Sequence, residues 1–198
     1  MTTLYLVRHG DNDWLDKGIA GRTAGVRLNA KGREQIKLVA ERLSKLDISV
    51  IYSSPLERAQ ESAAPLTELL GLPIIIDDDL NEVDFGVWNG CSHDKLNEDP
   101  RWHEWNRSRS TSACPNGEAF ADVYHRMGRF LRKVSELHEG ASIAAFGHGD
   151  PIKTAVMNVL ATPMDFVHRI EIYPASTTAI QFDQWGAKVL HVNQVQLP

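Results

Sequence analysis

Short apolar runs alternate with amphipathic stretches along this chain, and the alternation limits the folds that it can adopt. Four runs are of strand length, are rich in branched or aromatic residues and end at turn-forming residues: 3–8, 48–54, 73–77 and 142–149. Four other stretches repeat apolar residues at helical spacing: 30–46, 55–70, 117–138 and 151–161. Strands joined through helices pair in parallel, so the sequence predicts an α/β fold, a three-layer α/β/α sandwich with a mainly parallel central sheet. Residues 169–194 are expected to form hairpin-like strands that add an antiparallel edge strand.

Residues with strong capping preferences set the expected helix ends. Asn29 can cap the first helix, and Ser54 can cap the second with Pro55 at the first helical position. Gly71 and Gly140 are expected to end the second and third helices. These boundaries place each helix between two of the predicted strands.

The length of 198 residues allows a single domain with a sizeable core. We expect residues 1–198 to form one domain, in which the irregular, polar region 78–116 holds loops and short helices and segment 91–116 serves as a lid. Cys91 and Cys114 lack metal-ligand spacing, and we expect them to be structural thiols in a reducing compartment.

The net charge of the chain limits the partners that we expect it to bind. A formal net charge of -5 disfavours broad electrostatic binding to nucleic acid or to anionic membranes, so neither is an expected partner. The sequence has no run long enough to cross a bilayer and starts without a charged leader, which favours a cytoplasmic protein. A homodimer is an open alternative to a monomer.

Anion-binding and titratable side chains follow the carboxyl ends of the predicted strands. Arg8 and His9 follow the first strand, Arg58 the second, Glu82 the third and His148 the fourth. Since parallel strands end at one edge of a sheet, we expect these side chains to meet there. Taken singly, each arginine has the alternative of a surface ion pair and each histidine that of a structural hydrogen bond. Their joint occurrence at strand ends favours a shared site.

Two guanidinium groups beside two imidazoles favour phosphate as the bound anion. The planar fork of arginine matches phosphate oxygens, and helix N-terminal amides add donors. Sulfate would fit geometrically but is a rarer substrate. One imidazole nitrogen would attack phosphorus while the other imidazole donates to the oxygens, so the pattern predicts phosphoryl transfer through a phosphohistidine.

Five sequence blocks, in order, resemble those of the histidine phosphatase superfamily, also called phosphoglycerate mutase-like, in its RHG-motif branch. The blocks are LVRHG, GRTAGVRLNAKGREQ, IYSSPLERAQESA, LNEVDFGVWNG and FGHGDPIK. The resemblance implies that His9 is the phosphorylated nucleophile, that Glu82 is the proton donor, and that three residues form the phosphate pocket: Arg8, Arg58 and His148. It also implies further substrate-binding positions, namely Asn12, Arg22, Thr23 and Gly149.

Four positions depart from the family pattern. Leu15 stands where many members carry Asn, and Asn12 where many carry Ser or Thr. Gly147 replaces a frequent serine, and Asp150 a frequent glycine. Leu15 cannot form a hydrogen bond to phosphate, whereas Asn12 can. We expect these departures to affect efficiency and specificity more than catalysis itself.

The acid of the reaction must change its protonation state. Glu82 must be protonated to donate to the leaving alcohol, and then ionised to accept a proton from the attacking water. Neighbouring cations are expected to lower the pKa of His9 and also that of Glu82, and a bound phosphate dianion would raise the pKa of Glu82 again.

The stretch between Glu82 and His148 is shorter than in cofactor-dependent mutases of the superfamily, which suggests that water reaches the phosphohistidine. We therefore predict a hydrolase, a phosphomonoesterase of the histidine acid phosphatase type that acts on small phosphomonoesters. The alternatives are a phosphoglycerate mutase-type transferase and a catalytically weak phosphate-binding or interaction module.

The lid is expected to set specificity. Trp102 and Trp105, with Arg101, Arg107 or Arg109, would form a wall for an anionic or aromatic phosphomonoester, the alternative being tryptophans that pack on the core. No cofactor or metal is expected, because the sequence has no His-x-His or Asp-rich motif of the kind that metal phosphoesterases need.

Overall fold

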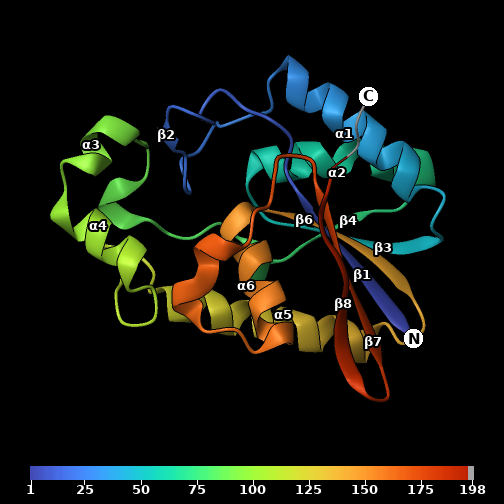
Figure 1. The fold of residues 1–198 in the computed structure, drawn as a ribbon. Coiled ribbons are helices and arrows are strands. Elements are labelled where there is room, and N and C mark those ends of the chain that lie inside the picture. The colour runs from blue at the N-terminus through green and yellow to red at the C-terminus, as the bar shows by residue number, and fades with distance from the viewer. Residues whose placement is uncertain (196–198) are drawn as a thin grey trace.

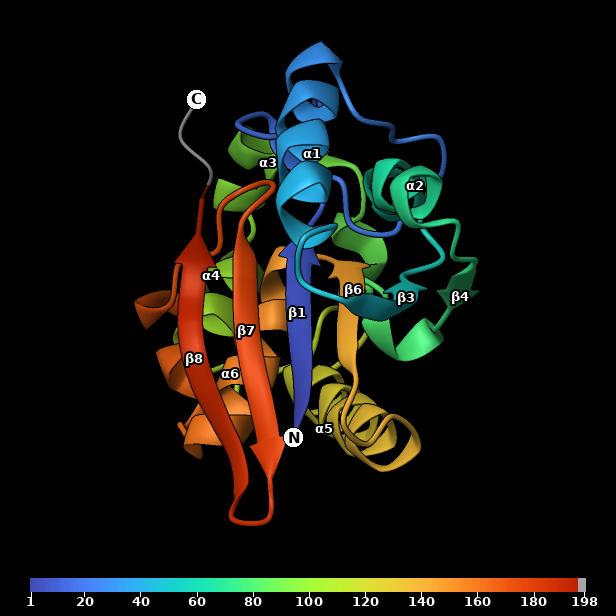
Figure 2. The same cartoon turned by 90° about the vertical axis from the view of Figure 1, so that its right-hand side faces the viewer.

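The computed structural model describes residues 1–195, and its centre is a six-stranded sheet in the order β4-β3-β6-β1-β7-β8. The strands are β1 (Thr2–Arg8), β3 (Ile48–Ser53), β4 (Ile74–Ile76), β6 (Ser142–Gly147), β7 (Thr177–Asp183) and β8 (Gly186–Gln194). β1, β6, β3 and β4 pair in parallel, while β7 runs antiparallel to β1, and β8 to β7. Figure 2 shows this sheet face on, with the β7–β8 hairpin at one edge. The predicted, mainly parallel sheet with an antiparallel edge is confirmed.

Helices cover both faces of the sheet and complete the predicted three layers (Figure 1). One face carries α1 (Ala30–Leu43) and α2 (Glu57–Leu70), and the other carries α5 (Phe120–Leu137) and α6 (Gly149–Leu160). Short elements make up the rest: β2 (Gly18–Ile19), η1 (Asp78–Leu80), η2 (Gly86–Trp88), β5 (Cys91–Ser92), α3 (His93–Asn97), α4 (Pro100–Arg107) and η3 (Met164–Arg169). α3 and α4 stand clear of the sheet in Figure 1, as the irregular composition of this region predicted.

The central strands β1 and β6 are largely apolar because helices cover both faces of the sheet there. Along β1, Leu4 and Leu6 pack with the residues under α5 and α6, whereas Val7 packs with those under α1 and α2. Successive side chains of a strand point to opposite faces, so a strand between two helical layers needs apolar residues at every position. A third cluster lies under α4 and contains Trp88 and Trp105.

The capping predictions hold for the start of α1 and the end of α2, but not for the start of α2. The side-chain oxygen of Asn29 accepts a hydrogen bond from the backbone N–H of Gly32 at 2.8 Å. Gly71 ends α2 in the left-handed conformation, with φ 67°. The prediction that Ser54 caps α2 is wrong, because the helix begins at Glu57 with Leu56 in the cap position and the Ser54 hydroxyl contacts another element. Among residues 1–195, no helix has the length and apolar character needed to cross a membrane.

Candidate active site

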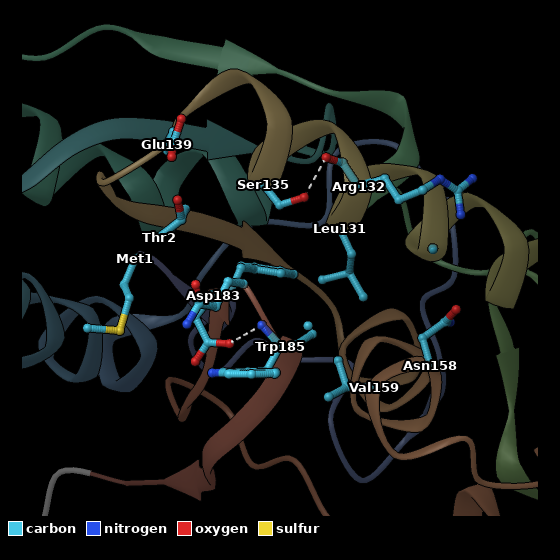
Figure 3. A pocket seen from close by; sticks show the side chains of 15 residues that line it. Met1, Thr2, Leu131, Arg132, Ser135, Glu139, Asn158, Val159, Asp183 and Trp185 are labelled. Atoms are coloured by element: carbon cyan, nitrogen blue, oxygen red, sulfur yellow. Dashed lines mark hydrogen bonds between the residues drawn. The ribbon is translucent and has the colours of Figure 1, made fainter.

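Four of the five predicted strand-end residues line a cavity of about 330 Å³, and the fifth, His148, packs against His9 outside this lining. The cavity lies at the carboxyl ends of β1 and β6, where α6 begins, and its lining includes Arg8, His9, Arg58 and Glu82. A larger hollow of about 860 Å³ lies at the opposite end of β1, beside Thr2 (Figure 3). None of the predicted site residues lines that hollow.

His9 presents one free imidazole nitrogen. Its Nδ1 atom lies 2.7 Å from the backbone oxygen of Gly10. A carbonyl oxygen can only accept, so Nδ1 carries the proton and Nε2 keeps its lone pair. Burial, and then the charges of Arg58 and Arg8, hold the pKa of His9 well below its ordinary value of 6.5. The imidazole is therefore neutral at physiological pH, and its Nε2 atom is unprotonated.

The glycine after His9 is required by a close approach of backbones. A Cβ atom at Gly10 would lie 2.5 Å from the backbone oxygen of Gly32, and one at Gly32 would lie 2.1 Å from that of Asp11. Gly10 also donates its N–H to the hydroxyl of Ser62 at 3.1 Å. The first turn of α1 thus clamps the loop that carries His9.

His148 lies behind His9 and is fully buried. The two ring centroids are 5.3 Å apart and the rings are inclined by 61°. The Nε2 atom of His148 is 2.8 Å from the hydroxyl of Ser54, which itself accepts the backbone N–H of Leu56 at 3.3 Å. The hydroxyl hydrogen is then free to point at Nε2, which assigns the imidazole proton to Nδ1. That buried Nδ1 atom has no partner among residues 1–195 and lies 3.9 Å from Glu82 Oε2.

The buried Arg58 and the half-buried Arg8 line the cavity and have guanidinium donors without a protein partner in the described residues. Arg58 donates from Nη2 to the backbone oxygen of Gly21 at 2.7 Å, but its Nε and Nη1 atoms are buried without a partner in the described part of the chain. Arg8 donates from Nη1 to the backbone oxygen of Ile172 at 2.6 Å, and its Nε atom is likewise unpartnered there. Because unpartnered buried N–H groups are costly, the two guanidinium groups favour an anionic ligand.

Glu82 is a buried carboxyl with one strong hydrogen bond. Its Oε1 atom accepts the backbone N–H of Val83 at 2.9 Å. Burial, and then the carboxylate of Asp150, raise the pKa of Glu82 above its ordinary value, and the opposing charges of Arg58 and Arg8 are outweighed. The expectation that cations lower this pKa in the free protein is therefore corrected, because it left out burial and the charge of Asp150.

The remaining predicted substrate-binding residues divide into two groups. Asn12 and Gly149 line the cavity, as does Leu15. Arg22 and Thr23 do not line it. Asn12 uses its side-chain oxygen to accept the N–H of Trp14 at 2.9 Å, which leaves its amide group as the donor for a ligand.

Of the three lid arginines, one reaches the cavity. Arg109 lies 3.2 Å above the ring of Trp105, and its Nη1 atom is 3.2 Å from Asp150 Oδ2. Arg101 and Arg107 instead form exposed ion pairs within the lid. Trp102 and Trp105 line the cavity, and Trp105 is also part of the apolar cluster under α4.

Three contributions were not expected from the sequence. Ser54 orients His148, Asp150 faces the site with its Arg109 partner, and Lys153 lines the cavity with Nζ 3.8 Å from Asp150 Oδ1. Lys153 lies one helical turn after Gly149 on α6, a spacing from which its position near the site could have been predicted. Within residues 1–195 no group of three or more His, Cys, Asp or Glu side chains could hold a metal ion.

This architecture and site define a class of α/β protein with two buried imidazoles and two arginines at the carboxyl edge of a mainly parallel sheet. The chain belongs to the histidine phosphatase superfamily (branch 1), whose family model matches residues 4–195. The resemblance seen in the five sequence blocks is confirmed.

Relatives in this family carry names of phosphatases and of mutases. The bifunctional protein Rv2228c of Mycobacterium tuberculosis is 32% identical over 197 residues, which cover 98% of this chain and 54% of that protein. This chain thus spans about half the length of that relative. Phosphoserine phosphatase 1 of Hydrogenobacter thermophilus is 28% identical over 195 residues, covering 98% of this chain and 92% of that protein. The probable phosphoglycerate mutase GpmB of an Enterobacter species is 30% identical over 189 residues, which cover 93% of this chain and 86% of that protein.

The fold matches solved structures of the same kind. The structure of Bacillus stearothermophilus YhfR aligns with a TM-score of 0.93 and 30% sequence identity, and covers 99% of this chain and 98% of that one. The α/β sandwich described above is therefore the histidine phosphatase fold.

Proposed function

We propose that the protein is a phosphatase that hydrolyses small phosphomonoesters through a phosphohistidine at His9. The observation that carries the proposal is the fixed tautomer of His9, whose Nε2 lone pair is free beside unpartnered guanidinium donors of Arg58. In the first step Nε2 attacks phosphorus, the bond from phosphorus to the ester oxygen breaks, and Glu82 gives its proton to the leaving alcohol. In the second step water attacks phosphorus, Glu82 takes a proton from that water, and the nitrogen–phosphorus bond breaks to release phosphate.

The geometry gives the other groups distinct tasks. Arg8 and Arg58 would hold the phosphoryl oxygens, and the Nδ1–H of His148 would donate to the oxygen on which charge develops. The raised pKa of Glu82 suits an acid that must start protonated. No metal or cofactor is needed for either step, because the covalent intermediate forms on a protein nitrogen.

Hydrolysis is favoured over transfer to a second phosphate acceptor. Within the described residues, segment 91–116 contains only the short elements β5, α3 and α4, and the cavity lined by Trp102, Trp105 and Arg109 has room for water. Lys153 and Arg109 place positive charge beside the aromatic wall, which supports a phosphomonoester with a second anionic group.

Phosphate release from a panel of esters tests this proposal. The panel contains p-nitrophenyl phosphate, phosphoserine, β-glycerol phosphate, and 3-phosphoglycerate with and without 2,3-bisphosphoglycerate. A phosphatase releases inorganic phosphate from several of these esters, and His9→Ala abolishes the release. Conversion of 3-phosphoglycerate to 2-phosphoglycerate without net phosphate release would instead identify a mutase. Binding of inorganic phosphate without turnover of any ester would identify a catalytically weak module.

A further inference from the structure

The loop 20–23 connects the phosphate-binding side of the cavity with its acid side. The backbone oxygen of Gly21 accepts a hydrogen bond from Arg58 Nη2 at 2.7 Å. In the next residue, Arg22 Nε donates to the backbone oxygen of Glu82 at 2.8 Å. Two successive residues of one loop therefore hold the two groups that must act on the same ester.

The rest of the Arg22 guanidinium is bound away from the cavity. Its Nη2 atom donates to Glu118 Oε2 at 3.1 Å, and its Nη1 atom lies 4.0 Å from Asp84 Oδ2. Nε and Nη2 thus donate to protein acceptors, Nη1 lies nearest to Asp84, and Arg22 is not among the residues that line the cavity.

Glu118 ties this arrangement to the long helix α5. Its Oε1 atom accepts from Arg126 Nε at 2.8 Å, and its Oε2 atom accepts from the N–H of Asp84 at 3.2 Å as well as from Arg22. Arg126 is nearly fully buried and also donates to the backbone oxygen of Asp79 at 2.7 Å. The segment that carries Glu82 is therefore braced on both sides.

The backbone conformation of the loop is also constrained, at Gly21 and Arg22. Gly21 has φ 52°, and a Cβ atom there would lie 1.9 Å from Asn89 Oδ1. The same Oδ1 atom accepts the N–H of Arg22 at 3.0 Å. The positive φ and the close approach of Asn89 fix where the carbonyl of Gly21 and the side chain of Arg22 point.

We propose that Arg22 is a positioning residue, which holds the acid Glu82 in register with Arg58 and does not contact the substrate. The inference rests on the proposed function, because it concerns the geometry of proton donation in that reaction. It replaces the substrate-binding role that the sequence resemblance implied for Arg22.

The leaving group of the ester distinguishes positioning of the acid from binding of the substrate. A nitrophenolate leaves without protonation, whereas an alkoxide needs a proton from Glu82 as it leaves. A displaced Glu82 therefore slows phosphorylation by an alkyl ester much more than by a nitrophenyl ester. Dephosphorylation is common to both esters, so the comparison uses the single-turnover rate of phosphoenzyme formation.

We expect Arg22→Ala to slow phosphoenzyme formation from β-glycerol phosphate about 10- to 100-fold and that from p-nitrophenyl phosphate less than about 3-fold, with little change in KM. Glu118→Gln removes the anchor without touching the cavity, and should give the same selective loss at smaller size. Arg27→Ala is the matched control, since Arg27 follows in the same loop region and pairs with Glu61 at the surface at 2.7 Å. Circular dichroism and thermal melting verify that each variant is folded.

Equal losses for both esters together with a raised KM would overturn the proposal, because they would mean that Arg22 binds the phosphate. Unchanged rates in both Arg22→Ala and Glu118→Gln would overturn it as well. If the unmodified protein forms no phosphoenzyme from either ester, the proposed function itself fails, and that outcome is distinct from a variant that fails to discriminate between esters.

Discussion

The Nε2 atom of His148 lies 2.8 Å from the hydroxyl of Ser54, and both side chains are fully buried. The two residues are 94 positions apart in the sequence and follow the ends of the adjacent strands β6 and β3. Their contact orients the imidazole and leaves its Nδ1 atom 3.9 Å from Glu82 Oε2. Ser54, which the sequence predicted to cap α2, therefore contacts a residue of the candidate site instead.

Ser54→Ala tests this contact. The loss of a buried hydrogen bond worth about 1 kcal/mol lets His148 adopt the other tautomer, and we expect phosphoenzyme formation to slow about 5- to 10-fold. Rapid-quench kinetics with p-nitrophenyl phosphate measures this rate. Ser53→Ala is the matched control, because the Ser53 hydroxyl is equally buried but donates to the backbone oxygen of Ser54 at 2.9 Å. Similar rates in the two variants would contradict the assigned role of Ser54.

The pH dependence of kcat/KM should change when Asp150 is replaced. The protein is expected to be active where His9 is neutral and Glu82 is protonated, so the alkaline limb reports Glu82. Since the carboxylate of Asp150 helps to raise the pKa of Glu82, Asp150→Asn should move the alkaline limb to lower pH. Glu34→Gln, at an exposed ion pair on α1, serves as the control and should leave the profile unchanged. An unmoved alkaline limb in Asp150→Asn would exclude this coupling.

The ion pair between Arg109 and Asp150 should contribute to the free energy of unfolding. Arg109 is buried, with its charge balanced by Asp150 at 3.2 Å, and it holds the lid against α6. Arg109→Met leaves a largely buried carboxylate without its hydrogen-bonded partner, and we expect a loss of about 3 kcal/mol in the free energy of unfolding. Adding Asp150→Asn should recover part of that loss in a double-mutant cycle measured by urea unfolding. The exposed lid pair Arg107–Glu104 supplies the control, and Arg107→Met should cost less than about 1 kcal/mol. Equal losses for the two arginines would show that the buried pair does not brace the lid.

Acid should destabilise the fold through the two buried imidazoles. The pKa values of His9 and His148 in the folded protein lie well below 6.5, so below that pH the unfolded chain binds protons that the folded protein excludes. Stability is then lost as the pH falls, by up to about 1.4 kcal/mol per pH unit for each imidazole. Glu82 acts in the opposite direction, because its raised pKa favours the folded state at low pH and this contribution fades as the pH rises. Unfolding free energies of His9→Gln between pH 7 and 5 should show a shallower loss than those of the parent, while the exposed His125→Gln should follow the parent. Parallel curves for His9→Gln and the parent would contradict the depressed pKa.

Local patterns were sufficient to predict the sheet and the strand-end residues. The strand "TLYLVR" is apolar on both faces because helices cover both, and its end carries Arg8 and His9 to the shared edge. The same periodicity rules placed Arg58 and His148 correctly, since each follows a parallel neighbour of β1 or β6. The fold and the gathering of the site could therefore be derived before the structure.

Contacts between distant residues could not be predicted in that way. Arg22 is 60 positions from the Glu82 carbonyl that it holds, and no periodicity relates the two. The pKa of Glu82 depends on burial, which a list of nearby charges does not contain. In the sequence, Asp150 is a departure from the family pattern and Arg109 is a charged residue of the lid. They form an ion pair because α6 packs beside the lid.

The central claim is that His9 Nε2 forms a bond to phosphorus. The most direct measurement is to mix the protein with a ³²P-labelled phosphomonoester, denature it in alkali within milliseconds, and locate the label by mass spectrometry. Phosphoramidates survive alkali and hydrolyse in acid, so the account predicts an alkali-stable, acid-labile phosphate on the peptide that carries His9, and none in His9→Ala. Label on another residue, or full turnover by His9→Ala, would contradict it.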